Sequence, residues 1–423
     1  MSLTDEARFI KACLPLDRPA GFKDALRQLI KPSLDWQEIS AIASWQGVAP
    51  LIYNNLKILD AASLVPGEFL GNVKDIYHAS LIRNMYLHAL LERVLRTFVK
   101  RDVACIVLKG MALANEIYRD IALRPMGDID LLIRYDDLAV AESCLTELGF
   151  TLNTEKPRNW SLQHHYHITY LDPQQNVPIE LHWHITHKRS PSRVQITDDI
   201  LIDAWWDRAS PSTIANRPAL ILSPGDQVFH LCQHFLKSRF SVGFVSKAGL
   251  IQLCDIANTV AHYRDQIDWQ QTRDDAEEYR MVSLVGAILE LAAEIVHNNS
   301  HALPVESRGI SVHDNHDLEM CRLMGSNLFE RAYIDMSFSN NAFKTLEGNS
   351  IRERLSGLLS ALFPDKAVLA EKYSVPVDSR KIYLYCLIHP FHQILRHRRF
   401  VSSISRLKKE KALRKWIGNS NFR

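Results

Sequence analysis

The chain has 423 residues, of which 47% are hydrophobic and 23% are charged. This composition excludes wholesale disorder and leaves enough apolar residues for two or three domain cores. The net charge is +2. The seven cysteines include no C-x-x-C pair, and their spacing does not indicate disulfide pairs, which favours a reducing compartment. Because the chain also shows no apolar leader and no apolar run long enough to span a bilayer, we expect a cytoplasmic protein without a transmembrane segment.

Residues 1–98 predict a helical region. Leu34, Ile39 and Ile42 are spaced as on one face of a helix, and a longer helix is expected over 69–100. From residue 104 the apolar period changes to that of strands, which predicts strands at 104–108 and 127–133. These two strands are separated by a helical stretch at 111–118 and a loop, and a helix is expected to follow at 135–148.

The second half of the chain begins with a predicted hairpin and continues as helix. Apolar runs at 166–171 and 177–185 flank the polar segment 172–176, and from residue 224 onward the pattern is helical. We therefore expect an α/β (α+β) core with a small mixed sheet, flanked by two all-helical regions. The expected domains are an N-terminal helical region at 1–98, the core at 99–215 and a C-terminal helical domain with a basic tail at 216–423.

The strongest chemical pattern is an acidic D-x-D on the second predicted strand. Successive strand residues alternate between faces, so Asp128 and Asp130 share one face while the intervening apolar residues enter a core. Paired carboxylates repel one another and favour Mg²⁺, so replacing Asp130 by asparagine is expected to raise stability. Glu180 lies in a later apolar strand. If that strand lies beside the first, three carboxylates converge as a two-metal phosphoryl-transfer site requires.

A glycine turn precedes this strand. The first predicted strand ends at Lys109-Gly110 and leads into a helix, an arrangement that lets a phosphate approach the backbone at a helix N-terminus. Lys109 adds a positive charge at the same place. The order strand, glycine, helix and acidic strand therefore indicates a site for a phosphorylated ligand.

These motifs resemble those of the polymerase-β-type nucleotidyltransferase superfamily, and more closely its largely uncharacterised bacterial branch. That branch has an L-K-G…Y…R-P-x-x-D-I-D-L-L pattern and a later strand of acid-x-H-W type. The matching residues here are Leu108-Lys109-Gly110, Tyr118, Arg124-Pro125, Asp128 to Leu132 and Glu180 to Trp183. The similarity extends over roughly residues 30–270.

The resemblance implies a metal-dependent nucleotidyltransferase that moves a nucleoside monophosphate from an NTP to a hydroxyl acceptor, which is a small molecule, a sugar or a protein. It assigns Mg²⁺ or Mn²⁺ to three catalytic carboxylates, Asp128, Asp130 and Glu180. The nucleotide-binding residues it implies are Lys109, Gly110, Arg124 and His182. The alternative is a weakly active or inactive binding or scaffold protein of the same fold, because Met111 stands where the wider superfamily has a second glycine or a serine.

Several histidines leave more than one interpretation open. His182 either lines the site, contacting a phosphate or orienting a carboxylate, or is purely structural. Zinc bound by His182 and His184 is the weaker alternative, since no cysteine or His-Glu-x-x-His motif accompanies them. His234 and Arg239 are candidates for the acceptor side, whereas His230 is expected to be a core residue. Asp255 is expected to pair with Arg239 or Lys247.

The last 28 residues are strongly basic. Ten lysines and arginines stand against one acid from residue 396 onward, so the tail carries +9 and the remainder of the chain −7. Either the tail docks on the acidic body or it meets an anionic partner such as a membrane surface. The negative body lacks the broad basic surface typical of nucleic-acid binders, so nucleic acid is not an expected partner.

Overall fold

The computed structural model describes residues 3–18, 20–153, 158–185, 200–241, 248–279, 281–297 and 381–396, with scattered positions between 310 and 379. The chain divides into two compact units. One unit contains the sheet and the helices from α1 to α13, except for the last three residues of α10, and the other contains those three residues and α18, Lys381–Arg396. The basic segment 397–423 lies outside the described residues, so both expectations for its role remain predictions.

The N-terminal region is helical, as the sequence predicts. Its helices are α1 (Asp5–Ala12), α2 (Phe22–Leu29), α3 (Trp36–Trp45), α4 (Ala49–Leu59) and α5 (Gly67–Lys100). Two of them begin at capping side chains: Thr4 accepts a hydrogen bond from the Ala7 amide at 3.2 Å, and Asp35 accepts one from the Glu38 amide at 2.9 Å. These bonds satisfy amides that have no partner inside the helix and fix where α1 and α3 begin.

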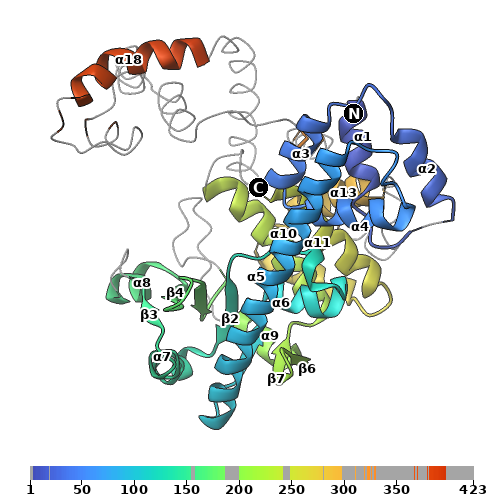
Figure 1. Cartoon of the computed structure of the whole chain (residues 1–423). Helices are drawn as coiled ribbons and strands as arrows, with labels where there is room; N and C mark the ends of the chain where they lie inside the picture. Colours follow the sequence, from blue (N-terminus) through green and yellow to red (C-terminus); the bar gives the residue numbers. More distant parts are fainter. Residues whose placement is uncertain are drawn as a thin grey trace. The chain divides into compact units, whose positions relative to one another are not determined.

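The core contains a seven-stranded mixed sheet in the order β3-β4-β5-β2-β1-β7-β6 (Figure 1). The strands are β1 (Cys105–Val107), β2 (Ile129–Ile133), β3 (Thr151–Leu152), β4 (His167–Leu171), β5 (Pro178–His182), β6 (Ser210–Ile214) and β7 (Arg217–Ile221). The predicted mixed sheet with flanking helices is therefore confirmed. The sheet also includes β7, which lies beyond residue 215, the position where the sequence places the end of the core.

Strand pairing sets the position of the acidic strands. β2 lies antiparallel to β1 and parallel to β5, with Asp130 opposite Glu180. β4 and β5 form the predicted antiparallel hairpin, in which His167 lies opposite His182. β2 and β5 are thus neighbours although two α-helices, a 3₁₀-helix and two strands separate them in the chain.

The two faces of the sheet differ in polarity. On one face the side chains of Ile129, Leu131 and Ile133 join a buried apolar cluster with residues of α5 and of α7 (Leu138–Glu147). The opposite face carries Asp130 and its neighbours, in agreement with the alternation of side chains along a strand. Burial of the apolar face therefore holds the acidic face in place.

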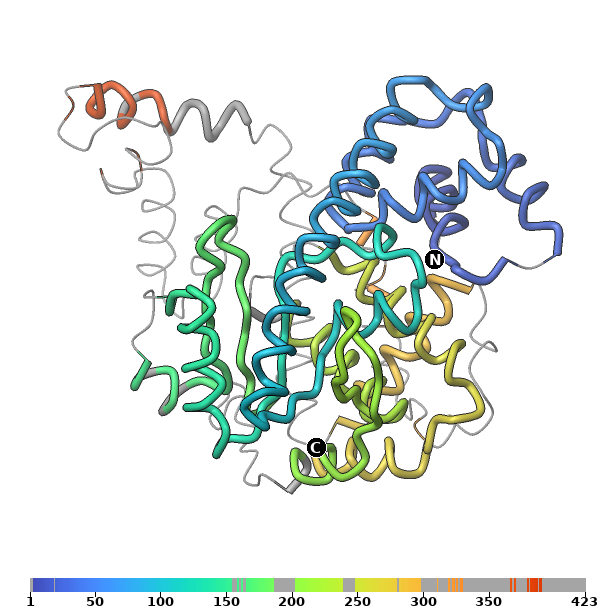
Figure 2. The backbone as a smooth tube through the Cα atoms, turned by 60° about the horizontal axis from the view of Figure 1, so that its bottom comes forward, coloured from blue at the N-terminus to red at the C-terminus, as the bar shows by residue number. Residues whose placement is uncertain are grey.

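Short helical segments connect the strands on the N-terminal side. They are α6 (Lys109–Leu113), the π-helix η1 (Ala114–Tyr118), the 3₁₀-helices η2 (Ile121–Leu123) and η3 (Tyr135–Asp137), and α8 (Arg158–His164). The later helices of the same unit are α9 (Ile200–Arg208), α10 (Pro224–Ser241), α11 (Gly249–His262), α12 (Trp269–Glu278) and α13 (Val282–His297). α1 contacts α13, so helices from both ends of this unit meet (Figures 1 and 2). Within the described residues, no helix combines the length and apolarity needed to cross a membrane.

Candidate active site

The structure brings the three acidic residues singled out by the sequence to one face of the sheet. Asp130 and Glu180 are paired across the parallel strands β2 and β5, and Asp128 immediately precedes β2 on the same face as Asp130. Asp130 is buried, Glu180 is partly buried and Asp128 reaches solvent. The three carboxylates therefore form a row that runs from the interior to the surface.

Two basic side chains contact the buried member of this row. Lys109 Nζ lies 2.8 Å from Asp130 Oδ1, and His182 Nε2 lies 2.9 Å from the same oxygen. Burial alone would raise the pKa of Asp130, but Lys109 and His182 outweigh it and hold this pKa well below its usual value. Asp130 is therefore ionised across the physiological pH range.

The outer carboxylates respond differently. The surrounding protein shields the Asp128 carboxylate from part of the water, and this desolvation raises its pKa. The negative charge of Asp130 adds to the effect, and the pKa of Asp128 is about 6. Burial opposes ionisation of Glu180 as well, but the hydrogen bond from His182 lowers the pKa of Glu180 below its usual value. Asp128 is thus the carboxylate of the three whose charge changes most readily near neutral pH.

Lys109 reaches Asp130 from a strained backbone position. It is the first residue of α6 and has a φ of 48°. This value lies in the left-handed region, which residues other than glycine seldom adopt. Such strain is retained when the surrounding structure determines it, and here Leu108 donates a backbone hydrogen bond to the carbonyl of Asp130 at 3.0 Å. The turn therefore locks Lys109 onto the acidic strand.

Gly110 leaves room for a second cation. A Cβ at this position would lie 2.5 Å from Arg124 Nη1 and 2.8 Å from Met126 Sδ, closer than atoms normally approach. Arg124 itself is held by Asp255 of α11, with Nη2 2.8 Å and Nε 3.4 Å from the two carboxylate oxygens. Tyr118 donates a further hydrogen bond to Asp255 at 2.7 Å.

Asp255 is thus paired with Arg124 and Tyr118, whereas the side chains of its expected partners, Arg239 and Lys247, lie outside the described residues. The partner is Arg124 because η1 and α11 are in contact, which places Tyr118 and Arg124 beside Asp255. Asp255 is fully buried, and a buried carboxylate without a cation would be very unfavourable. Arg124, predicted to bind nucleotide, is therefore also part of the core that joins the loop before β2 to the later helices.

Two histidines of the hairpin lie beside Glu180. His182 Nε2 is 3.2 Å from one Glu180 oxygen, and His167 Nε2 is 3.9 Å from the other. His184 behaves differently: it is buried, and its Nδ1 accepts a hydrogen bond from the Ile185 amide at 3.0 Å. The sequence analysis did not select His167, although the length of the turn at 172–176 already sets it opposite His182.

One face of α10 completes the surroundings of the carboxylates. His230 and His234 are one turn apart, and Lys237 follows with its Nζ 3.9 Å from the centre of the Tyr166 ring. Burial and the nearby charge of Lys109 lower the pKa of all three, that of His230 to about 3 and that of Lys237 to about 7. The Gln252 amide nitrogen lies 3.1 Å from His234 Nε2. The side chain of Arg239 lies outside the described residues.

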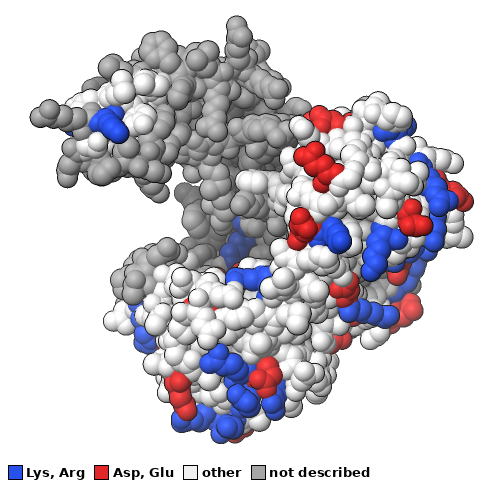
Figure 3. Space-filling view, in the orientation of Figure 1, with Lys and Arg blue, Asp and Glu red and all other residues white. Residues whose placement is uncertain are grey.

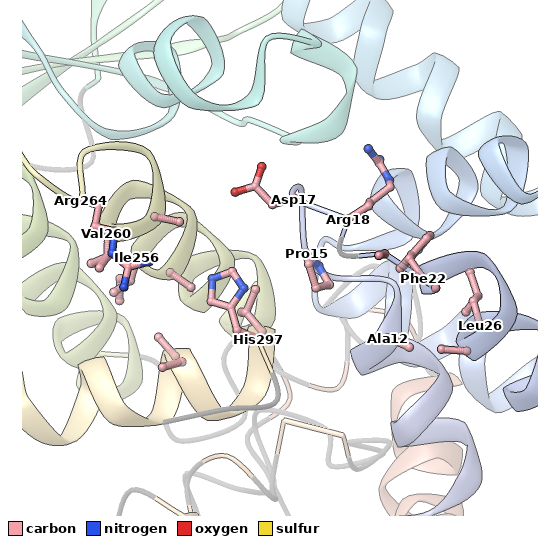
Figure 4. A pocket seen from close by; sticks show the side chains of 18 of the residues that line it. Ala12, Pro15, Asp17, Arg18, Phe22, Leu26, Ile256, Val260, Arg264 and His297 are labelled. Atoms are coloured by element: carbon pink, nitrogen blue, oxygen red, sulfur yellow. The ribbon is translucent and has the colours of Figure 1, made fainter. Parts of the chain in front are cut away.

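A separate cavity of about 600 Å³ lies away from this cluster. Figure 4 shows side chains from α1, α2 and the segment between them facing those of α11 and α13 across it. Most of the lining is apolar, with Asp17, Arg18, Arg264 and His297 as the charged or titratable members. None of the residues predicted to bind metal or nucleotide lines this cavity.

Comparison with known proteins gives one match. A family model described as "Uncharacterised nucleotidyltransferase" covers residues 32–297. This range includes every carboxylate of the row and the whole of α10. No curated protein and no solved structure matches the chain.

Proposed function

Since the chain belongs to the family of uncharacterised nucleotidyltransferases, we propose that it transfers a nucleoside monophosphate from an NTP to a hydroxyl acceptor with the help of Mg²⁺ or Mn²⁺. The observation that carries the proposal is the row formed by Asp128, Asp130 and Glu180 on one face of paired strands. Carboxylate oxygens are the ligands that these metals prefer.

The donor set fits such a metal. Asp130 and Glu180 come from two paired, hydrogen-bonded strands, so the sheet fixes their relative position, and Asp128 directly precedes one of these strands. Lys109 and His182 neutralise Asp130 in the absence of metal, which keeps like charges from separating the strands. Bound metal would lower the pKa of the acceptor hydroxyl and stabilise the charge of the departing pyrophosphate.

The protein groups divide the remaining tasks. Lys109 and Arg124 lie beside Gly110 and supply positive charge for the triphosphate, which holds its α-phosphorus near the carboxylates. The acceptor oxygen forms a bond to this phosphorus as the bond to the β-phosphate oxygen breaks, and pyrophosphate leaves. The hydroxyl proton passes to the carboxylate of Asp130 or Glu180.

The acceptor enters from the side of α10 in this proposal. His234 and Lys237 lie on a face whose pKa values respond to Lys109 and Asp130, so that face adjoins the carboxylate row. Arg239, two residues after Lys237 in the sequence, is the second residue proposed for the acceptor side. Cationic and neutral hydrogen-bonding groups together favour an acceptor that carries negative charge.

A scaffold role is the second candidate. Met111 follows Gly110, where the wider superfamily has a second glycine or a serine. Lys109 already pairs with Asp130, so the protein supplies a positive charge where a metal ion would otherwise bind. An inactive member would retain these contacts and the fold while lacking turnover. Binding of NTP with no pyrophosphate release would favour this second candidate.

The remaining proposals concern surroundings and partners. On the face shown in Figure 3, basic and acidic side chains of the described residues are interspersed, which supports the expectation that nucleic acid is not the substrate. We place the protein in the cytoplasm. An anionic partner or membrane surface for the segment 396–423 remains the proposal for that tail.

The deciding experiment is a nucleotide panel on the full chain. Thermal shift with each of the four NTPs, with and without Mg²⁺ or Mn²⁺, is expected to give a metal-dependent rise for at least one of them. Incubation with that NTP and a mixture of candidate acceptors is then expected to release pyrophosphate. Absence of any metal-dependent shift, with the protein folded, would count against the proposal.

A further inference from the structure

Two histidines lie beside Glu180, and they offer nitrogen donors, which Mg²⁺ does not favour. His167 and His182 are opposite one another on β4 and β5, and Glu180 lies on the same face two residues before His182. The resemblance places Mg²⁺ or Mn²⁺ on Glu180 together with Asp128 and Asp130, and it places nucleotide at His182. It assigns no ligand to His167 and none to the three residues as a set.

We propose that His167, Glu180 and His182 form a separate binding site for a divalent transition metal of the zinc type. One ligand atom from each of these three residues lies within 4.8 Å of the others. Two imidazoles and one carboxylate are a zinc-binding set, whereas Mg²⁺ favours oxygen donors alone. The proposal shares Glu180 with the proposed magnesium site but does not depend on nucleotidyl transfer.

The distances suit a tetrahedral ion. Zinc bonds of about 2.0–2.2 Å imply ligand atoms about 3.3 Å apart. His182 Nε2 and one oxygen of Glu180 are 3.2 Å apart, and His167 Nε2 is 3.9 Å from the other oxygen. The rings of the two histidines have centroids 5.0 Å apart. The three donor atoms lie within 4.8 Å of one another, so a bound ion would have to draw them closer together.

Hydrogen bonding within the protein does not account for the position of His167. Its Nδ1 is buried and has no hydrogen-bond partner among the described residues, and its Nε2 is too far from Glu180 for a hydrogen bond. Buried polar atoms are normally satisfied, so hydrogen bonds to the described residues do not hold this ring in place. Its other nitrogen, Nε2, faces Glu180 without a hydrogen bond and is the atom offered to a metal ion.

The charge around the site allows His182 to take part. In the structure His182 binds both Asp130 and Glu180, and withdrawing it from Asp130 would expose a buried carboxylate. Lys109 also binds Asp130, at 2.8 Å, and remains as its counter-ion. His182 is therefore free to exchange its hydrogen bond for a metal bond.

Zinc binding to the full chain tests the proposal without any nucleotide. After treatment with chelator, the protein is titrated with Zn²⁺ by calorimetry and with Co²⁺ by visible absorption, which reports four-coordinate geometry. We expect one equivalent to bind, His167→Gln to weaken binding about tenfold or more, and the absorption band to disappear in that variant.

Two control variants make the result specific. His165→Gln changes a neighbouring histidine outside the group, and Asp128→Asn changes only the proposed magnesium set; both are expected to bind Zn²⁺ like the unaltered chain. His167→Asn replaces His167→Gln if the latter fails to fold. The proposal is overturned if the unaltered chain binds no Zn²⁺, or if the His167 variant binds it equally well. Because no nucleotide is present, failure of the transferase proposal would leave this outcome unchanged.

Discussion

Asp255 on α11 binds the guanidinium of Arg124 at 2.8 Å, although the two residues are 131 positions apart in the sequence. Through this contact the loop that precedes the acidic strand is fixed to a helix of the later region. Tyr118 binds the same carboxylate, and Gly110 lies against the other side of Arg124. The proposed nucleotide side of the site is therefore positioned from two distant parts of the chain.

Removing Asp255 is expected to destabilise the protein strongly. Asp255→Ala leaves the buried Arg124 without its counter-ion, and breaking one partner of a buried pair costs about 3–5 kcal/mol. Tyr118→Phe removes a single hydrogen bond and is expected to cost about 1–2 kcal/mol. Urea unfolding measures both. Equal losses for the two variants would contradict the assignment of Arg124 as the main partner.

Asp130→Asn is expected to abolish metal-dependent NTP binding while the protein still folds. The sequence alone suggests that this change also raises stability by relieving repulsion, but the structure reverses that expectation. Asp130 is paired with Lys109 and His182, so neutralising it leaves the buried Lys109 less well compensated, weakens the contact with His182 and costs about 2–3 kcal/mol. Thermal melting and NTP shifts on one sample check both parts. Unchanged metal-dependent binding would refute the role of Asp130.

Gly110→Ala is expected to destabilise the chain and weaken NTP binding. The added methyl group would meet Arg124 and Met126 below normal contact distance, and overpacking of this kind costs about 1–3 kcal/mol. Gly71→Ala is the matched control, because Gly71 lies within α5 and nothing lies within 4 Å of its Cβ position. This substitution is expected to increase the free energy of unfolding by up to about 1 kcal/mol. Opposite signs in thermal melting are the predicted result.

Acid should destabilise the protein partly through His230. Burial, and then the charge of Lys109, lowers the pKa of His230 from 6.5 to about 3. The unfolded chain therefore binds a proton below pH 6.5 that the folded chain does not bind until pH is near 3. Folding stability falls across this window as pH drops, by at most about 1.4 kcal/mol per pH unit for this one group.

His230→Phe removes the titrating ring and keeps a flat side chain beside Trp205, whose ring centre is 5.7 Å from that of His230. Urea unfolding at pH 6.5 and pH 4.5 is expected to show a smaller loss of stability in this variant than in the unaltered chain. An identical loss in both would mean that His230 gains its proton in the folded state as readily as in the unfolded one.

The sequence predicts the acidic face well because strand alternation is a local rule. Asp128 and Asp130 could be placed together from their spacing alone, and the hairpin from its turn residues. Sequence spacing does not determine which strands are neighbours in a sheet. The convergence of Glu180 on Asp130 was therefore conditional until β5 was seen beside β2.

The partner of Asp255 shows where local reasoning fails. Arg239 and Lys247 are its nearest cations on the preceding segment, but Arg124 reaches it through packing of η1 on α11. Tertiary contacts of this kind depend on how helices approach one another, which periodicity does not reveal. The same holds for Lys237, whose position over Tyr166 requires α10 to lie across the hairpin.

The parallel pairing of β2 with β5 also bears on how the site forms. Asp130 and His182 are 52 positions apart, so a long loop must close before the acidic face exists. Non-local pairing of this kind slows folding and tends to form late. A partly folded chain can therefore hold the Lys109–Asp130 contact, 21 positions apart, well before it has a complete set of carboxylates. The contact between Asp130 and His182 would form after that more local one, which would delay ion capture until β5 has joined β2.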